Sequence, residues 1–536
     1  MEASRPLASR IASLVHDHFN ALPTRCKPTV HPDGSREWVP MSGIVVVKGE
    51  NTPSETLTCV AVTTGAKCLS ASQIPRCRGL VLHDCHAEIL ALRAFNYWLL
   101  KECRSLLDTE TVAEDDDVPI SPFVRRRRLF GRRKDLDAPN SKGSGPWPPF
   151  ELRPDIKIYM YCTCAPCGDA SMELCMAAQE DPTPWTVPSR PDLNTITATT
   201  TSTDTPSSPT ANLLDGRAHF SLLGVVRRKP ARADAESTRS KSCSDKLALR
   251  QVTSLLSYPA SLLVAPTESA YLAGLVLPEE EISRVACARA FGDGETGRMR
   301  ALRGAAWTTT GSSDDEESCG YRFRTFQVLS VPTEEVEAQW AFGKPKTTPI
   351  PPPPSPSAQA EEEVHGKAPP PKKKSKTGNV SAVWTAAPSS SLNHHSGVQS
   401  KSSTTGGLLE VIINGVKQGN RASPPTARGA SALSRAKMWG LLRDIVARLS
   451  PLCYSGKTVR ENGDGDLEND DAVRWRILEA TSYEQFKRAP KMSTDLIRLR
   501  EQAMQDAKRV LQGWIPNRGD EEWGVEVLID PGKKKS

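Results

Sequence analysis

The sequence has little of what a secreted or a membrane protein needs. Its first residues, Met-Glu-Ala-Ser-Arg-Pro, contain no apolar signal core, and no apolar run is long enough to span a membrane. Fourteen cysteines would otherwise suit a disulfide-bonded secreted protein. Without a signal sequence we expect reduced thiols, a few of which bind metal, in a protein of the nucleus or the cytoplasm.

Apolar residues and net charge are also low for a chain of 536 residues. Only 38% of the residues are hydrophobic and 43 are prolines, so we expect one large core interrupted by unfolded inserts. The sequence shows no internal repeat. Because the net charge is only +6, a nucleic-acid partner would have to be bound by local basic patches rather than by the total charge.

Hydrophobic periodicity predicts helices and strands that are interspersed along the chain. The predicted helices span residues 6–22, 84–101, 170–178, 247–256, 279–290, 430–449, 471–487 and 493–512. The predicted strands span residues 38–47, 56–64, 155–161, 219–226, 270–277, 380–384 and 408–413, and we expect the last two to pair. Gly65 to Cys68 is typical of a turn.

Three inserts interrupt this pattern in what we expect to be a single domain over residues 1–536. Residues 104–150 contain a basic patch at 125–134, which fits a solvated loop, an RNA contact or a nuclear-import signal. Residues 181–214 and 343–408 are rich in Pro, Ser and Thr, and the second also contains three lysines at 372–374. Their composition predicts disorder, because it cannot bury enough apolar surface to offset the ordering entropy.

The most informative stretch is Asp84-Cys85-His86-Ala87-Glu88, at the start of the predicted helix 84–101. Asp84 would be the N-cap of this helix. A zinc-dependent hydrolytic deaminase uses a histidine as metal ligand and a glutamate, not itself a ligand, to transfer protons. His86 and Glu88 fit these roles, although such a pair alone is more often solvated or capping.

Cysteine supplies the remaining candidate ligands. Pro166-Cys167 follows the predicted strand 155–161, but Ala170 stands where a deaminase usually has its second cysteine. Either Cys164 or the distant Cys243 could complete the site, and we favour Cys243 because a thiol at a helix start has a lowered pKa. Most other cysteines are expected to be small buried hydrophobes: Cys26, Cys59, Cys77, Cys85, Cys103, Cys162, Cys175, Cys287, Cys319 and Cys453.

Three segments, 84–88, 166–170 and 242–246, in this order resemble the editase family of RNA adenosine deaminases. The family includes double-stranded-RNA editors and the tRNA-specific adenosine deaminase. The resemblance implies a cytidine-deaminase-like, three-layer α/β core with a C-terminal helical elaboration. It also implies one catalytic zinc ion on His86, Cys167 and Cys243, and hydrolysis of adenosine to inosine with Glu88 as the acid–base group.

The resemblance is closer to the tRNA enzyme, in its fungal form, at residues 241–251. Fewer than forty residues precede the first predicted strand, too few for the separate RNA-binding domains of the double-stranded-RNA editors. The implied substrate is the adenosine just 3′ of the anticodon in alanine tRNA. Candidate phosphate contacts are Lys67, Arg232 and Lys241, although each could be a plain surface charge. The family commonly has Thr at the position of Ala66, which puts a ribose contact there in doubt.

The resemblance further implies a buried inositol hexakisphosphate behind the zinc site. The matching positions are Arg93, Lys246, Lys437, Tyr483, Lys487 and Trp514. Leu92 and Leu249 stand where relatives often have Arg, so we expect fewer or shifted contacts. The alternatives are an editor of double-stranded or messenger RNA, a catalytically silent RNA-binding relative, and a structural zinc protein, which would need four protein ligands.

Overall fold

The fold is that of a computed structural model, which describes residues 5–110, 121–127, 147–178, 214–216, 222–229, 236–308, 320–344, 376–389, 407–449, 473–474, 477–488 and 495–529. Within these segments, every helix is too short or too polar to cross a membrane. Arg232, most of the residues 181–214 and 345–375, and the lysines at 372–374 lie outside them. The predictions made for those residues therefore stay predictions.

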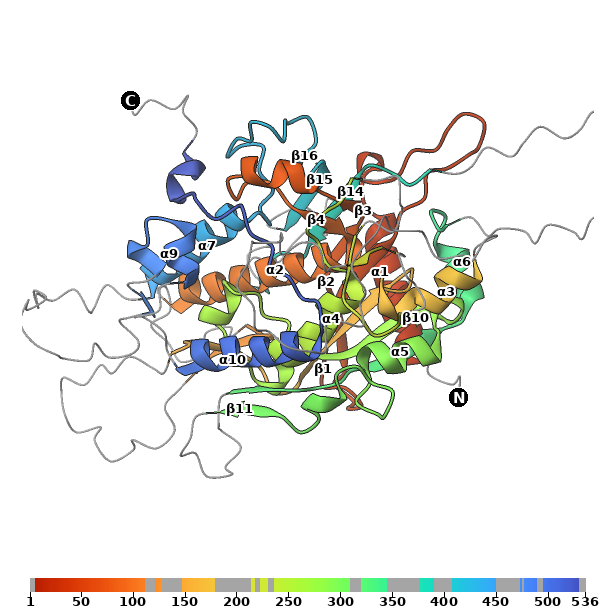
Figure 1. The fold of residues 1–536 in the computed structure, drawn as a ribbon, viewed down its shortest axis with the longest axis horizontal. Coiled ribbons are helices and arrows are strands. Elements are labelled where there is room, and N and C mark those ends of the chain that lie inside the picture. Colours follow the sequence, from red (N-terminus) through yellow and green to blue (C-terminus); the bar gives the residue numbers. More distant parts are fainter. Residues whose placement is uncertain are drawn as a thin grey trace, which may run out of the picture.

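A mixed eight-stranded sheet forms the middle of the molecule (Figure 1). In spatial order its strands are β13 (Gln327–Val331), β10 (Leu272–Pro278), β7 (Ile156–Cys162), β1 (Met41–Lys48), β2 (Thr56–Thr64), β14 (Ser381–Thr385), β15 (Leu408–Ile413) and β16 (Val416–Lys417). β10 runs parallel to β7 and β13, and the other pairs are antiparallel. The predicted pairing of 380–384 with 408–413 is confirmed.

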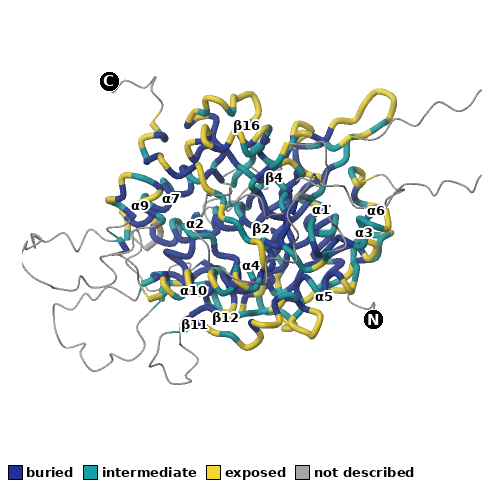
Figure 2. The backbone as a smooth tube through the Cα atoms, in the orientation of Figure 1, coloured by how far each residue is buried: buried dark blue, intermediate teal, exposed yellow. Residues whose placement is uncertain are grey.

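Helices cover both faces of this sheet, and its side chains alternate between the two faces. Along β1, Ile44 and Val46 join one core cluster, while Val45 and Val47 join another. The first cluster packs under α2 (Ala87–Glu110), α4 (Cys243–Thr253), α5 (Arg284–Phe291) and α7 (Arg435–Arg448). The second packs under α1 (Leu7–Asn20) and α6 (Thr333–Gln339). The predicted three-layer α/β fold is confirmed, and Figure 2 shows the buried centre.

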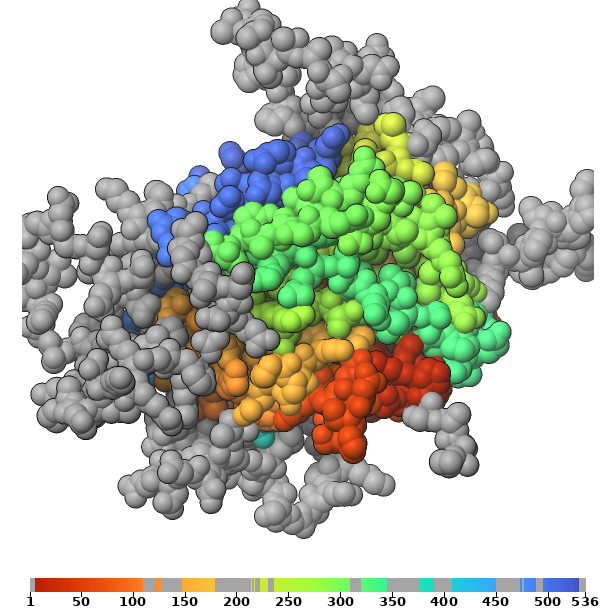
Figure 3. Space-filling view, turned by 90° about the horizontal axis from the view of Figure 1, so that it is seen from below, coloured from red at the N-terminus to blue at the C-terminus, as the bar shows by residue number. Residues whose placement is uncertain are grey.

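The C-terminal helices complete the first side. α9 (Tyr483–Arg488) contributes Phe486, whose ring stacks on Trp439 of α7 with 5.0 Å between centroids. α10 (Asp495–Val510) packs on α4 and on the hairpin of β11 (Ala306–Thr308) and β12 (Gly320–Arg322). Figure 3 shows α10, in blue, beside green segments of the chain that spread over the lower face.

Some local predictions are wrong. Ala66–Cys68 is not a turn but strand β3, which pairs with β4 (Asp84–His86). The helix therefore begins at Ala87, so Asp84 is not its N-cap. The helix also continues to Glu110, inside the predicted insert 104–150, because Cys103, Leu106 and Leu107 are buried in the core.

Two further segments differ from their predictions. Within the basic insert, β5 (Val124–Arg126) pairs with β6 (Phe150–Leu152), and Arg125 forms an ion pair of 2.7 Å with Glu151. Residues 222–226 of the predicted strand 219–226 are irregular, and a two-residue strand, β9 (Arg227–Arg228), follows them and pairs with β8 (Leu214–Asp215). Short strands of this kind depend on tertiary contacts more than on periodicity.

Candidate metal centre and active site

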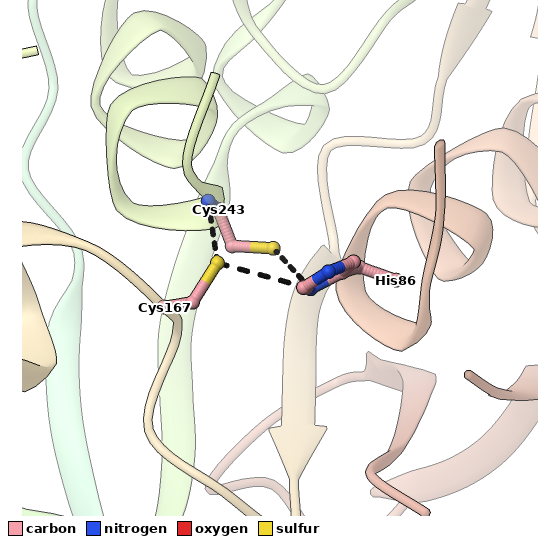
Figure 4. Close-up of side chains that lie close together, drawn as sticks. All are labelled: His86, Cys167 and Cys243. Atoms are coloured by element: carbon pink, nitrogen blue, oxygen red, sulfur yellow. Dashed lines mark hydrogen bonds between the residues drawn. The ribbon is translucent and has the colours of Figure 1, made fainter. Parts of the chain in front are cut away.

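Three junctions far apart in the sequence bring His86, Cys167 and Cys243 together. His86 ends β4, directly before α2. Cys167 lies in the loop between β7 and the short helices η3 (Asp169–Ser171) and α3 (Met172–Ala177). Cys243 is the first residue of α4. Figure 4 shows the two sulfur atoms and the imidazole ring pointing toward one another.

The spacing of these side chains suits a zinc ion. The Nδ1 atom of His86 lies 3.8 Å from Sγ of Cys167 and 3.7 Å from Sγ of Cys243. The three candidate ligand atoms all lie within 4.8 Å of one another. Tetrahedral zinc with ordinary bond lengths separates a nitrogen ligand from a sulfur ligand by about 3.6 Å. The site could therefore hold zinc with three protein ligands.

Serine and glycine fix the approach of α4 to the Cys167 loop. Ser242 caps α4, and its Oγ accepts a hydrogen bond of 3.1 Å from Asp245 N. Gly168 has a φ of +104°, and a Cβ there would lie 2.2 Å from Ser242 Oγ, so only glycine fits. Ser244 donates through its backbone N to Cys167 O at 3.0 Å. These contacts hold both cysteines at one helix end.

The groups around Cys167 favour the thiolate form, which is the form that binds a metal ion. Its Sγ accepts a hydrogen bond of 3.3 Å from the backbone N of Cys243. Its contact with Cys243, followed by the charges of Lys229 and His86, holds the pKa of the Cys167 thiol well below its usual range despite burial. Burial raises the pKa of both Cys164 and Cys243, but Cys243 belongs to the group of candidate ligands and Cys164 does not. The geometry therefore favours Cys243 over Cys164.

A buried lysine lies directly behind the sulfur atoms. Lys229 Nζ lies 3.2 Å from Sγ of Cys243 and 2.9 Å from Oδ2 of Asp84. Lys246 forms a second ion pair with Asp84. Although burial alone would raise it, these two lysines hold the pKa of Asp84 well below its usual value. We call Asp84, Lys229 and Lys246 the Asp84 cluster.

Glu88 lies in the first turn of α2, and only 6% of its surface is exposed. Burial, followed by the charge of Cys167, raises the pKa of Glu88. A carboxylate with a raised pKa next to a metal centre can take up and return a proton near neutral pH. Its position therefore suits the acid–base role expected from the sequence.

Sequence reasoning missed Lys229 and gave Asp84 the wrong role. Lys229 belongs to a stretch, 227–242, that is polar and basic and predicts an exposed loop, yet only 3% of its surface is exposed. No sequence pattern marks it, because its burial depends on Asp84 and Cys243. The run of neighbouring basic residues was the available signal, and it indicated the opposite environment.

The three candidate RNA contacts differ in their environments. Lys67 is exposed on β3, where it pairs with Cys85 and lies one position from His86. Arg232 lies outside the described residues. Lys241 is only 3% exposed: it bonds to Asn517, and its Nζ lies 5.7 Å from the centre of the Trp514 ring. This burial does not suit a phosphate contact at the surface, and the RNA contact of Lys241 stays a prediction.

Lys241 belongs instead to a group of buried or half-buried basic residues, which we call the cation cluster: Arg93, Lys241, Arg250, Arg500 and Lys508. Burial, followed by the charges of Arg500 and Arg93, lowers the pKa of Arg250 to about 9. Burial, followed by Lys246 and Lys508, lowers the pKa of Lys241 to about 7. Among the described residues, no carboxylate forms an ion pair with any member of the cluster.

The other residues expected at an inositol phosphate lie on the same side of the molecule. Lys437 on α7 and Lys487 on α9 are half-buried, and Tyr483 is 6% exposed. Trp514 is half-buried and packs with Leu249 beside α10. Arg250 and Arg500 were not expected, and they occupy the region for which Leu92 and Leu249 had suggested fewer cations.

Residues 61–293 match the family model of the adenosine-deaminase (editase) domain. This range contains His86, Glu88, Cys167 and Cys243. The part of the chain that carries these four residues is therefore similar to the adenosine-deaminase (editase) domain.

Several curated proteins are similar to this chain. The chain is 34% identical over 293 residues to tRNA-specific adenosine deaminase 1 of Schizosaccharomyces pombe, covering 54% of this chain and 62% of the relative. It is 27% identical over 259 residues to the Saccharomyces cerevisiae protein of that name, covering 48% and 55%. The chain is 32% identical over 130 residues to mouse double-stranded RNA-specific editase B2. This match covers 24% of this chain and 14% of the relative. The chain thus spans little more than half the length of its two fungal relatives.

Proposed function

We propose that this protein is a zinc-dependent deaminase that converts adenosine to inosine in tRNA. One observation carries the proposal: His86, Cys167 and Cys243 lie at zinc-ligand spacing, and the buried Glu88 follows His86 by two residues. The tRNA-specific relatives support the RNA class. Three ligands also leave one coordination position open, as catalysis needs and a structural zinc site does not.

The chain's own residues account for the remaining chemistry. A bound zinc ion would supply the Lewis acidity that lowers the pKa of a coordinated water to about 7. Glu88 would accept the proton of that water, deliver it to N1 of adenine and later assist the departure of ammonia. Burial raises the pKa of Cys243, and the charge of Lys229, whose Nζ lies 3.2 Å from Sγ of Cys243, opposes that rise and would favour the thiolate form of a bound ligand.

We further propose that the target nucleotide is the adenosine 3′ of the anticodon in alanine tRNA. The likeness of residues 241–251 to the tRNA enzyme supports it. A base in an anticodon loop costs less to unstack than a base in a duplex, which suits a pocket that must enclose it. The test is inosine formation in an alanine tRNA transcript, with a transcript carrying guanosine at that position as control. Inosine formation only in duplex RNA would favour the editor alternative instead.

Substitution of Glu88 tests the mechanism. Glu88→Gln should retain zinc and lower inosine formation by about a hundredfold to ten-thousandfold, as expected for loss of an acid–base group. Zinc content and single-turnover rates measure both outcomes. Near wild-type turnover in the purified variant would contradict the assignment, and a wild-type protein without turnover would favour the silent relative.

A pair of cysteine variants tests the ligand set. Cys243→Ser should lose zinc and activity, whereas Cys164→Ser, the matched control, should keep most of both. Metal analysis of the two purified proteins decides the point. The reverse result would mean that Cys164 and Cys167 form the ligand pair.

The cation cluster supports a second bound group, inositol hexakisphosphate. Clustered buried cations without carboxylate partners need anionic charge to offset their desolvation. Arg93, Lys246, Lys437 and Lys487, with Tyr483 and Trp514, would surround such a molecule together with Arg250 and Arg500. Mass spectrometry of the denatured, purified protein should detect the compound at one per chain. Its absence from active enzyme would contradict this part of the proposal.

A further inference from the structure

A second group of cations lies on the surface rather than in the core, and the proposed function leaves it unassigned. It consists of Lys67, Arg76, Arg78, Arg421, Arg428 and Arg518, all of which are exposed. We call this group the basic surface. Its residues come from β3 and the segment that follows it, the loop that follows β16, and the C-terminal segment that follows α10.

Packing makes these three segments one continuous surface. Ile74, Cys77 and Val416 share a small apolar cluster, against which Ala422 also packs. A Cβ on Gly519, next to Arg518, would lie 3.9 Å from a methyl group of Ile74. The backbone N of Lys417 bonds to Gly429 O at 2.9 Å, which brings Arg428 beside β16. Figure 2 shows exposed chain around β16.

The composition of these segments is strongly one-sided. Residues 66–82, 414–429 and 514–519 contain seven Lys or Arg and no Asp or Glu, whereas the whole chain has 69 basic and 63 acidic residues. At its margin, Glu236 contacts Ser72 at 2.6 Å, and Glu522 is exposed beyond Asp520. Within the described part of the chain, neither forms an ion pair with an arginine of the surface.

Four arginines elsewhere at the described surface are paired with a carboxylate, whereas Arg25, Arg284 and Arg322 are exposed without an ion pair to any described residue, like those of the basic surface. Arg303, Arg324, Arg498 and Arg509 each lie within ion-pair distance of a carboxylate. The five arginines of the basic surface have no such partner among the described residues. An uncompensated positive field of this kind attracts a polyanion.

Arg78 adds an independent observation. Its φ is +49°, in the left-handed region that favours glycine and that strains a long side chain. Strained residues of this kind tend to occur where function requires them. Glycine at this position would avoid the backbone strain but would lack the positive charge. The presence of arginine despite the strain therefore indicates a role for its side chain.

The location relates this surface to the metal centre. Lys67 pairs with Cys85 across the β3–β4 ladder, and the neighbouring pair joins Ala66 to His86. From there the surface extends through Arg76 and Arg78 to the β16 loop. We propose that it binds the phosphate backbone of the RNA that flanks the target nucleotide, a proposal that rests on the proposed tRNA deaminase function. Arginine suits phosphate contacts because its guanidinium can bind two oxygens at once.

Two matched sets of variants test the proposal. The first set replaces Arg76, Arg78, Arg421 and Arg428 by Gln, and the control set replaces Arg303, Arg324, Arg498 and Arg509 by Gln, so both lose the same charge. Equilibrium binding of unmodified alanine tRNA is measured over a series of salt concentrations. The first set should weaken binding about a hundredfold near physiological salt and reduce the salt slope by about 0.7 for each arginine lost. The control set should change both far less.

Arg78→Gly separates binding from folding. The variant should keep or raise the melting temperature, because glycine relieves the strain, yet it should bind tRNA more weakly. A drop in melting temperature together with unchanged affinity would overturn the role of Arg78.

The outcomes also separate this proposal from the proposed function. If the wild-type enzyme is active and the two variant sets lose tRNA affinity and salt slope equally, the proposed role of the basic surface is overturned. A wild-type protein that binds tRNA through these arginines but forms no inosine supports the surface and overturns the deaminase function. If the first set loses heparin binding but keeps its tRNA affinity, the surface belongs to another polyanion, such as an acidic protein, and the proposal fails.

Discussion

The two groups of buried charge on the α2 side of the sheet differ in their counter-charge. In the Asp84 cluster the protein supplies it, because Asp84 lies between Lys229 and Lys246. In the cation cluster, Arg250 donates to Leu256 O at 2.9 Å and Arg500 to the same oxygen at 3.3 Å. Carbonyl oxygens carry only partial charge, so the second cluster is only partly compensated.

This difference in counter-charge indicates a structural role for the Asp84 cluster and a ligand-binding role for the cation cluster. A compensated cluster can hold its geometry in the protein alone, and the Asp84 cluster does so next to the proposed zinc ligand Cys243. An uncompensated cluster costs folding free energy unless an anion binds, since a buried charge needs a partner. The same folded domain thus contains one site whose charges are balanced by its own residues and another that the proposed anion would balance.

The largest expected effect comes from removing the buried lysine of the compensated cluster. Lys229→Met leaves Asp84 with one partner and Cys243 without a donor, so the free energy of unfolding should fall by about 3 to 5 kcal/mol. Urea unfolding and zinc content measure both consequences. Lys246→Met is the matched control, and it should cost less because Lys246 is 20% exposed. Equal stability of Lys229→Met and wild type would mean that Asp84 needs only Lys246.

The sequence predicted the grouping of His86, Cys167 and Cys243 better than the surroundings of that group. His86, Cys167 and Cys243 each stand where a helical pattern begins, so the pattern and the residue type pointed to the same places. Lys229 has no such signal, because its burial arises from contacts with residues 145 and 14 positions away. A lysine in a basic stretch is ordinarily exposed, and tertiary structure reversed that expectation.

The same limit applies to the fold. The long strands β1, β2, β7, β10, β14 and β15 were predicted from alternation or apolar runs, whereas the three-layer arrangement was implied by the family resemblance. β3 and β4 have three residues each, too few for any period, so they were read as a turn and a helix start. The edge strand β13 was missed for another reason: its exposed and half-buried residues form no apolar run.

The opposite face of the sheet offers a third case, an ionisable group that is buried with no charged partner in the part of the chain that the structure describes. His16 on α1 is fully buried, its Nε2 lies 2.8 Å from Tyr161 Oη, and burial lowers the pKa of His16 to about 4. The unfolded chain binds a proton below pH 6.5, whereas the folded protein does so only near pH 4. Stability is therefore fully present above pH 6.5 and falls as the pH drops, by up to about 3 kcal/mol at pH 4.

His16→Gln should remove this part of the pH dependence. The variant loses some stability at pH 7.5, because its contact with Tyr161 changes, but it should lose less than wild type between pH 6.5 and pH 4. Unfolding free energies at these three pH values decide the matter. Parallel curves for the two proteins would show that other groups cause the acid sensitivity.

The smallest expected effect is that of Arg500→Met on the free energy of unfolding. Its sign depends on whether inositol hexakisphosphate is bound. Arg500 on α10 is 8% exposed, and its Nε has no hydrogen-bond partner among the described residues. With inositol hexakisphosphate present, Arg500→Met should lower the free energy of unfolding by about 2 kcal/mol, as expected for a lost charge-assisted hydrogen bond. Without the anion, the same change removes a buried, repelled charge and should be neutral or stabilising.

Arg509→Met on the same helix is the matched control, because Arg509 lies at the surface in an ion pair of 2.9 Å with Asp506. It should change stability by less than about 1 kcal/mol, with or without the anion. Thermal unfolding of both variants, with and without added inositol hexakisphosphate, gives the comparison. If Arg500→Met destabilises the protein equally in both conditions, the carbonyl oxygen of Leu256 is sufficient for that arginine. The cation cluster would then be compensated from within, as the Asp84 cluster is.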